Sequence, residues 1–229
     1  MARVSLMVLL ATAAVLSACE RTEKPAGPTA PSGPVTERAG PARWNATTGG
    51  FEFNGKPLKT AKLWTFEGST EGFTAVSSKI VPASDQGLSV QVADPTLRSP
   101  KGLNVPGAQY PLVLVRLTRT AAGEGWDGAL YYATANHPEA STFFGKPLGA
   151  VAPALNETVT LVYDMAHQTV GAPDWTASTI DEIRLDIEDK AGGGFIIRQI
   201  AIAESPGPDA LGPAPAAPPA PAPAAAPKP

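Results

Sequence analysis

The sequence contains a single cysteine, Cys19, among 229 residues. This count excludes an internal disulfide, although exported proteins of this size often depend on such bridges. The two histidines, His137 and His167, lie in no recognisable metal-ligand or nucleophile motif. A Gly-x-Ser-x-Gly element is also missing, and Gly192-Gly193-Gly194 falls between expected strands and does not open a helix. We therefore expect a protein that is not an enzyme and binds no cofactor.

Positive charge is scarce and scattered along the chain. The 18 Lys and Arg residues are outnumbered by 21 Asp and Glu, which gives a net charge of -3, and no basic cluster is present. Proteins that bind nucleic acid concentrate Lys and Arg on one face. The charge pattern therefore argues against a nucleic-acid partner and against a polybasic membrane patch.

The one long apolar run lies near the first residue. Arg3 precedes an uncharged segment, 4–16, and small residues then lead to Cys19. A positive start, an apolar centre and a small-residue end form the pattern of a secretory signal. The apolar segment is short for a bilayer span. We therefore expect residues 1–18 to be a signal peptide.

The ending Leu16-Ser17-Ala18-Cys19 resembles the bacterial lipobox. This resemblance implies that the chain is cut before Cys19 and that the Cys19 thiol is acylated. The protein would then be tethered to a lipid bilayer outside the cytoplasm. Glu20 stands where a membrane-retention aspartate would stand in the enteric sorting pattern, which implies the outer membrane of the cell envelope.

Composition divides the rest of the chain into three parts. Residues 19–43 are mostly Pro, Gly, Thr, Ala and charged residues, with Val35 the one large aliphatic, so we expect a lipidated cysteine and a disordered linker. Residues 206–229 are almost entirely Ala and Pro, which predicts an extended, disordered tail. Between them, residues 44–205 contain all four tryptophans and amount to one domain.

The middle domain has the periodicity of β-strands. Its short runs of Val, Ile, Leu, Thr and aromatic residues are separated by Gly, Pro, Asn and Asp. The one helix candidate is a turn or two around residues 174–178. Alternation in the last run places Ile196, Arg198, Ile200 and Ile202 on one face. The pattern predicts an all-β, two-sheet antiparallel sandwich. The expected strands are 61–66, 88–92, 112–119, 128–134, 158–164, 180–187 and 195–203.

A series of short motifs in the middle domain resembles the galactose-binding-like jelly rolls, the fold of many carbohydrate-binding modules. The resemblance covers nearly all of this domain, and the motifs occur in the family's order. It implies a jelly roll whose first and last strands lie side by side, so that the two low-complexity arms leave near one another. The motifs are Trp64-Thr65-Phe66-Glu67-Gly68, Glu71-Gly72-Phe73, Asp94-Pro95, Ser99-Pro100, Leu130-Tyr131-Tyr132, Phe143-Phe144, Tyr163-Asp164-Met165, Trp175, Ile183-Arg184-Leu185-Asp186 and the run from Phe195 to Ile202.

The resemblance implies a sugar ligand held on exposed aromatic faces. Trp126, in a glycine-flanked turn, is the most plausible platform, and a tryptophan that caps the core is the alternative. Tyr131 and Tyr132 point to opposite faces of a strand, so one belongs to the core; we expect Tyr132 to face the ligand. Trp175 is the third candidate, with a structural role as its alternative. A structural calcium, which related jelly rolls hold near the first and last strands, stays open because the last strand lacks an acidic pair.

Two functions from different classes remain. In the first, a lipid-anchored module binds polysaccharide at the cell envelope. In the second, the sandwich is a structural or assembly scaffold that contacts another envelope protein. The sequence does not identify a glycan or a protein partner.

Overall fold

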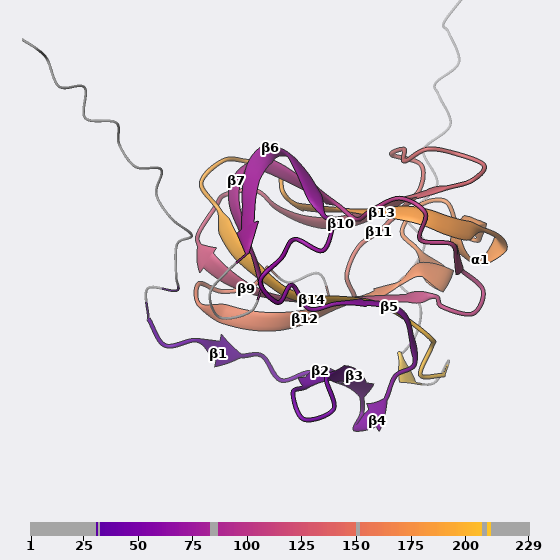
Figure 1. Cartoon of the computed structure of the whole chain (residues 1–229), viewed down its shortest axis with the longest axis horizontal. Helices are drawn as coiled ribbons and strands as arrows, with labels where there is room; N and C mark the ends of the chain where they lie inside the picture. Colours follow the sequence, from indigo (N-terminus) through magenta and orange to yellow (C-terminus); the bar gives the residue numbers. More distant parts are fainter. Residues whose placement is uncertain (1–30, 32, 83–86, 150–151, 208–209, 212–229) are drawn as a thin grey trace, which may run out of the picture.

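The computed structural model describes residue 31 and residues 33–82, 87–149, 152–207 and 210–211, and two layers of β-strands make up most of this part (Figure 1). The expected all-β sandwich is confirmed. All seven expected strands are present; their ends differ by at most two residues, except that the strand expected at 88–92 extends to Arg98. Cys19, the signal peptide and most of the expected tail lie outside the described residues. Within the described part, no helix is both long and apolar enough to cross a bilayer.

The lower layer in Figure 1 has the strand order β1-β12-β9-β14-β5. Its neighbours are antiparallel except for β1, which pairs in parallel with β12. The pairing of β5 with β14 places Trp64 opposite Ile200, so the first and last strands of the expected jelly roll are indeed adjacent. The strands are β1 (Thr36–Glu37), β5 (Thr60–Trp64), β9 (Leu112–Ala121), β12 (Glu157–Asp164) and β14 (Gly194–Ala203).

The upper layer has the order β6-β7-β13-β10-β11, with the short β8 also paired to β13. All of its pairs are antiparallel. Its strands are β6 (Thr74–Pro82), β7 (Leu88–Arg98), β8 (Val105–Pro106), β10 (Trp126–Thr134), β11 (Phe144–Gly145) and β13 (Thr179–Glu188).

Strand β7 belongs to both layers. Its first residues, from Leu88, pair with β14 of the lower layer, and its last residues, up to Arg98, pair with β13 of the upper layer. Backbone hydrogen bonds therefore join the two layers along this side of the sandwich. Along its other side β7 pairs with β6, so β7 has hydrogen-bonded neighbours on both sides.

The main core lies between the two layers and combines aliphatic side chains with seven buried aromatic ones. The helix α1 (Asp174–Ala177) inserts Trp175 into this core, where its indole Nε1 donates a hydrogen bond to the Tyr110 carbonyl at 3.1 Å. This helix confirms the expected turn around residues 174–178. A short 3-10 helix, η1 (Met165–His167), follows β12. The buried aromatic residues are Trp64, Phe66, Phe73, Tyr132, Tyr163, Trp175 and Phe195.

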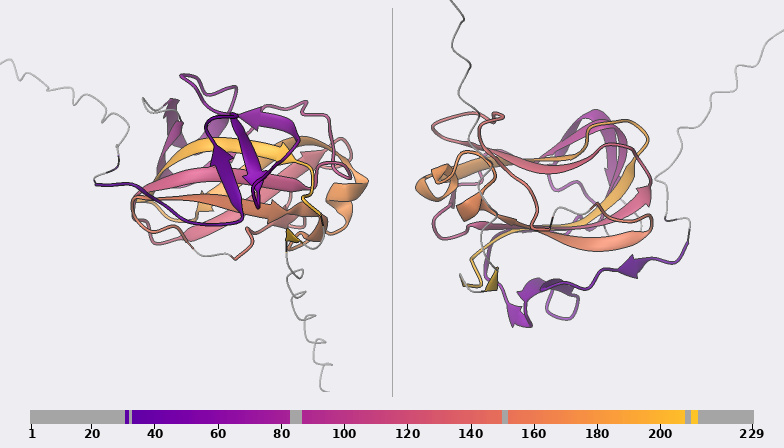
Figure 2. Two further views of the ribbon diagram at one scale, coloured as in Figure 1. Left: turned by 90° about the horizontal axis from the view of Figure 1, so that it is seen from below. Right: turned by 180° about the vertical axis from the view of Figure 1, so that it is seen from behind.

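A small three-stranded sheet covers the outside of the lower layer (Figure 2, left). It consists of β2 (Ala42–Asn45), β3 (Gly50–Phe53) and β4 (Lys56–Pro57). Phe51 and Phe53 are buried against Leu112 and Leu114, which point outward from β9. The sequence indicated only one core, but an apolar second face on β9 requires such a cover.

The folded part begins before Arg43, the residue at which the linker was expected to end. Strand β1 pairs with β12, and Arg38 forms a bidentate ion pair with Glu157 at 2.6 Å and 2.8 Å. At the other end, Leu211 packs on the small-sheet core although the tail was expected to start at residue 206. Both boundaries were misplaced for the same reason. Composition alone does not show that a segment packs against residues elsewhere in the chain.

A β-bulge changes the alternation of β14. The register shifts between Ile197 and Gln199, so the core receives Phe195 and Ile197 and then Ile200 and Ile202. The expected face with Ile196, Arg198, Ile200 and Ile202 together was wrong. An extra residue in one strand reverses the side-chain alternation that follows it.

Candidate functional site

The outer face of the upper layer carries a row of side chains that crosses five strands. Cross-strand pairing aligns Phe144 with Tyr131, Tyr131 with Arg184, Arg184 with Arg98, and Arg98 with Thr74. Neighbouring strands lie about 4.8 Å apart, so the row extends over roughly 19 Å. The core side chains of β10 and β13 point the other way, as strand alternation requires.

Tyr131 and Arg184 stack at the centre of this row. The Arg184 Cζ, on β13, lies over the Tyr131 ring, 4.1 Å from its centroid. Phe144 lies on β11, on the other side of β10, and its ring centroid is 5.3 Å from that of Tyr131. Burial raises the pKa of the Tyr131 phenol, and the negative charge of Asp127 raises it further, while Arg184 opposes both. The phenol therefore stays protonated at neutral pH, and the Tyr131 ring is held between the Arg184 guanidinium and the Phe144 ring.

A loop carboxylate joins the arginines of the row. Glu139 Oε1 accepts a hydrogen bond from Arg184 Nη1 at 3.0 Å and a short one from Arg98 Nη2. Arg184 Nη2 in turn donates to Asp186 Oδ2 at 3.1 Å. All four side chains are less than one quarter exposed. This network fixes the direction of both guanidinium groups before any ligand arrives.

The loop that carries Glu139 is held against α1. His137 Nε2 lies 2.9 Å from Asp174 Oδ2, and the His137 ring stacks on Phe143 with 3.9 Å between centroids. The Tyr132 hydroxyl donates to the same Asp174 oxygen at 2.8 Å. The core thus positions the loop, and through it the carboxylate of Glu139.

A polar cleft of about 440 Å³ opens beside this loop. Among the described residues that line it, two cationic side chains, Arg98 and Lys101, accompany three carboxylates, so donors stand among acceptors. A ligand rich in hydroxyl groups satisfies such a lining, because each hydroxyl both donates and accepts. The lining side chains are Arg98, Lys101, Thr134, Asn136, His137, Glu139, Asp181 and Glu182.

Two of the three aromatic residues expected to contact a ligand are fully buried. Tyr132 and Trp175 have 0% exposed area and meet edge to face, with ring centroids 4.9 Å apart. Burial raises the pKa of the Tyr132 phenol, whose oxygen also accepts a hydrogen bond from Gln168 Nε2 at 3.0 Å. Neither ring presents a face to solvent, which corrects the expectation for both. Tyr131 and Tyr132 do point to opposite faces of β10, as expected, but the outward residue is Tyr131 and not Tyr132.

Trp126 lies away from the polar cleft. It is partly buried at the end of the sandwich, where its ring is 6.1 Å from that of Phe195 and packs over Gly128. This position agrees with the alternative of a tryptophan that caps the core. Arg98, Glu139 and Asn136 were not predicted from the sequence, because loops and distant strands bring them together. The outward alternation of Arg184 and Asp186 on β13 was the one available signal.

Three carboxylates gather where β10 begins and β13 ends, and in the described part of the chain they form the one group able to hold a metal ion. Oxygen atoms of Asp127, Asp186 and Asp189 lie within 4.8 Å of one another. Lys146 Nζ contacts Asp127, and Arg184 donates to Asp186, so two of the three carboxylates already have a cationic partner. The group lies away from the pair of strands where the resemblance implies calcium, and we assign no ion to it.

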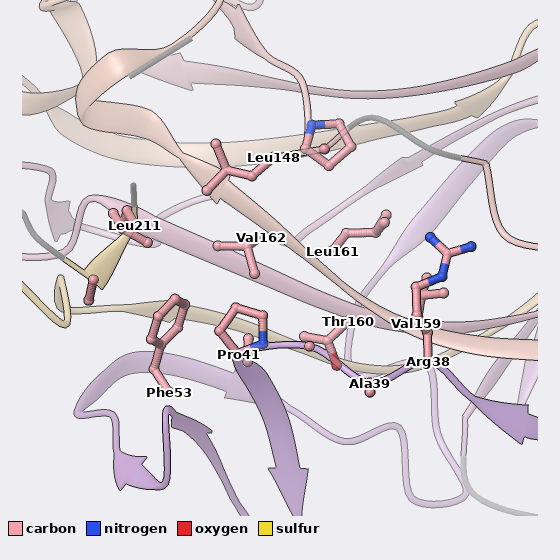
Figure 3. Close-up of a pocket in the computed structure, with 15 residues that line it drawn as sticks. Arg38, Ala39, Pro41, Phe53, Leu148, Val159, Thr160, Leu161, Val162 and Leu211 are labelled. Carbon is pink, nitrogen blue, oxygen red and sulfur yellow. The ribbon is translucent and has the colours of Figure 1, made fainter. Parts of the chain in front are cut away.

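A second hollow is an apolar groove of about 400 Å³ at the edge of the lower layer (Figure 3). Pro41 and Phe53 form one side, and Leu148, Val162 and Leu211 form the other. Residues near both described ends of the chain thus meet in one place, as expected if the two arms leave near one another.

No protein-family model matches the sequence, and a comparison with curated proteins finds no match. Among solved structures, the xylan-binding CBM22-1 domain of Paenibacillus barcinonensis Xyn10C is 14% identical, with 65% of this chain and 97% of that chain covered and a TM-score of 0.41. The carbohydrate esterase vb_24B_21 of the Shiga toxin-encoding bacteriophage phi24B is 12% identical over 65% of this chain and 99% of that chain, with a TM-score of 0.39. An exo-beta-agarase is also 12% identical over 66% of this chain and 25% of that chain, with a TM-score of 0.39. Similarity at this level does not assign the chain to a family.

Proposed function

We propose that the protein is a non-catalytic, lipid-anchored component of the cell envelope that binds polysaccharide in the polar cleft. The observation that carries the proposal is the fixed network of Glu139 with Arg98 and Arg184 beside the Tyr131 ring. Sugars are recognised by hydrogen bonds to their hydroxyls together with flat surfaces against their rings. The cleft supplies donors and acceptors, and the adjoining row adds the partly exposed Tyr131 ring with the Arg184 guanidinium stacked on it.

The proposed anchor is the acylated Cys19, and the proposed location is the outer membrane. The lipobox-like ending before Cys19 supports the anchor, and Glu20 after it supports the location. Two or three acyl chains would hold the protein firmly, since each buried methylene contributes about 0.8 kcal/mol. Mass spectrometry of the native protein should find an acylated Cys19 at its amino terminus. An unmodified chain that still begins with Met1 would refute the anchor.

Calorimetric titration of the purified protein against a panel of neutral and acidic envelope polysaccharides tests the cleft. Glu139→Gln keeps the shape of the side chain but removes the charge that orients both arginines. We expect it to weaken binding roughly tenfold to a hundredfold, the effect of a hydrogen bond to a charged group. Glu124→Gln, an exposed loop carboxylate outside the cleft, is the matched control.

Failure to bind any glycan of the panel would count against the proposal. Cross-linking in cells then distinguishes the scaffold function. A single stoichiometric protein partner whose capture is unaffected by Glu139→Gln would favour that function instead.

A further inference from the structure

The apolar groove of Figure 3 lies along an open part of the edge of β12. At one end of this part, the Arg38 N–H donates to the Thr158 carbonyl at 2.8 Å, and the chain then turns away toward the small sheet. At the other end, the Leu148 N–H donates to the Val162 carbonyl, also at 2.8 Å. The groove therefore has a paired position of β12 at each end, and Thr160 lies between them.

The backbone of Thr160 faces the open edge. In an antiparallel pair, every second residue directs its N–H and C=O groups to the partner strand, and the residues between direct theirs away from it. The carbonyls of Thr158 and Val162 are directed away from β9, as the two hydrogen bonds above show. Thr160 has the same phase. Among the described residues, none forms a backbone hydrogen bond with its N–H or C=O on this side.

The walls of the groove are apolar. Apart from Arg38 and Thr160, the described residues that line it are aliphatic, aromatic, proline or glycine. Apolar walls around an available N–H and C=O suit an extended peptide, whose main chain bonds to the edge while its side chains fill the walls. A hydrocarbon chain suits the groove less, because it would bury both backbone groups without a partner.

The chain itself supplies a peptide of this kind. Figure 3 shows Leu211 at the end of the groove opposite Arg38, and the chain continues from there into residues 212–229. Residues 212–227 are only Gly, Ala and Pro, so their side chains are small and uncharged. The prolines favour an extended backbone, and the alanines between them keep the N–H groups that bonding to a strand edge requires.

We propose that the protein's own Ala/Pro-rich tail, residues 212–229, docks in this groove as an extended segment beside β12. One alanine of the tail donates its N–H to the Thr160 carbonyl and accepts from the Thr160 N–H. The connection through Leu211 keeps the tail at an effective concentration of about millimolar, so modest contacts are enough to hold it. The groove belongs to the lower layer and the polar cleft to the upper one, so this inference does not depend on the proposed function.

The test compares the full chain with a short chain that ends at Leu211. Hydrogen exchange of the Thr160 N–H, followed by NMR, is the measurement. We expect exchange to be roughly tenfold or more slower in the full chain, because a docked tail protects an N–H that is otherwise open to water. The Ile183 N–H, which donates to Ser99 Oγ in the upper layer, is the control and should exchange at the same rate in both proteins.

A third protein tests the composition of the tail without a change in the folded part. Its residues 212–229 are replaced by alternating Gly and Ser, which keeps the length but removes the prolines and the apolar side chains. We expect its Thr160 N–H to exchange as fast as that of the short chain.

A synthetic peptide of residues 212–229 tests the contact directly. It should bind the short chain and bind the full chain roughly tenfold or more weakly, because the attached tail competes with it. Thr160→Pro removes the N–H at a strand edge, where proline is tolerated. In the short chain it should weaken peptide binding about threefold to tenfold, and Thr160→Val, which keeps the N–H, is the matched control.

Equal exchange of the Thr160 N–H in the full and the short chain would overturn the proposal, as would equal protection in the Gly/Ser protein. Protection that grows with protein concentration would also overturn it, since the tail would then bind a second copy. So would a short chain that binds laurate and not the peptide, because the groove would then hold an acyl chain.

Discussion

The Arg184 Cζ lies 4.1 Å from the centroid of the Tyr131 ring, directly across the antiparallel pair of β10 and β13. A cation over an aromatic face contributes about 0.5–1 kcal/mol at an exposed site and more where water is excluded. The same guanidinium bonds to Glu139 and Asp186. One side chain therefore couples the aromatic part of the row to its carboxylates.

Removal of this guanidinium should change the titration of the phenol. Burial and then the Asp127 charge raise the Tyr131 pKa, while Arg184 lowers it. Without the positive charge, the phenolate loses its one favourable neighbour among these groups. Arg184→Gln should therefore raise the Tyr131 pKa still further. Spectrophotometric titration, with Tyr131→Phe to identify the signal and Arg43→Gln as control, measures the change, and a lower pKa would contradict it.

The buried hydroxyl of Tyr132 should matter for stability. Tyr132→Phe removes the donor to Asp174 and the acceptor for Gln168 without a change in ring packing. We expect the free energy of unfolding in urea to fall by about 1–3 kcal/mol, because buried polar groups lose their partners. Tyr131→Phe, on the outward side of the same strand, should have a smaller effect. Equal stabilities of the Tyr132→Phe protein and the original would show that the hydroxyl network contributes nothing.

The ion pair that fastens the first strand should make stability depend on pH. Hydrogen bonds from Arg38 lower the pKa of Glu157, burial opposes this, and the Ala154 N–H at 2.8 Å lowers it further. A lowered pKa in the folded state means that the stabilisation is present above the ordinary carboxyl pKa of about 4.3 and is lost as the pH falls through the folded value. Glu157→Gln should therefore cost about 1 kcal/mol at neutral pH.

At pH values well below 4, Glu157→Gln and the original protein should unfold at nearly the same urea concentration. Glu124→Gln should match the original at both pH values. If the Glu157→Gln protein is still less stable than the original at low pH, its loss of unfolding free energy comes from packing and not from charge.

Gly193 is required next to a buried carboxylate. Glu188 is fully buried, its Oε1 accepts from Arg119 Nη2 at 3.1 Å, and a Cβ at Gly193 would overlap its Oε2. Gly193→Ala should lower the free energy of unfolding by about 1–3 kcal/mol, the usual effect of overpacking. Gly50→Ala is the control, since a Cβ there has no neighbour closer than 4.0 Å. Thermal unfolding measures both, and equal loss in the two variants would refute the steric explanation.

The strands of the sandwich were predictable because both of its layers impose alternation on their sequences. Leu185 and Ile187 point inward on β13, as the pattern predicts. Alternation failed at β14, where the bulge before Gln199 reverses the faces, and no local signal marks that extra residue. The small sheet was missed because its strands have two to four residues each. Leu112 and Leu114 were the available hint, since a strand that is apolar on both faces needs a partner on each.

The site was less predictable than the fold. Choosing between Tyr131 and Tyr132 requires the phase of β10, and an irregularity within this strand, between Trp126 and Ala129, shifts its register with β13. Glu139 lies in a loop, and nothing in its neighbourhood along the sequence indicates that it reaches Arg98 and Arg184. Such residues are defined by tertiary contacts and have no local pattern.

The described ends of the chain give the molecule a direction. Pro41 and Leu211 line the same groove beside the small sheet, so both described ends of the chain lie below the lower layer in Figure 1. The row from Phe144 to Thr74 lies on the outer face of the upper layer, so it is on the side of the sandwich opposite both described ends of the chain.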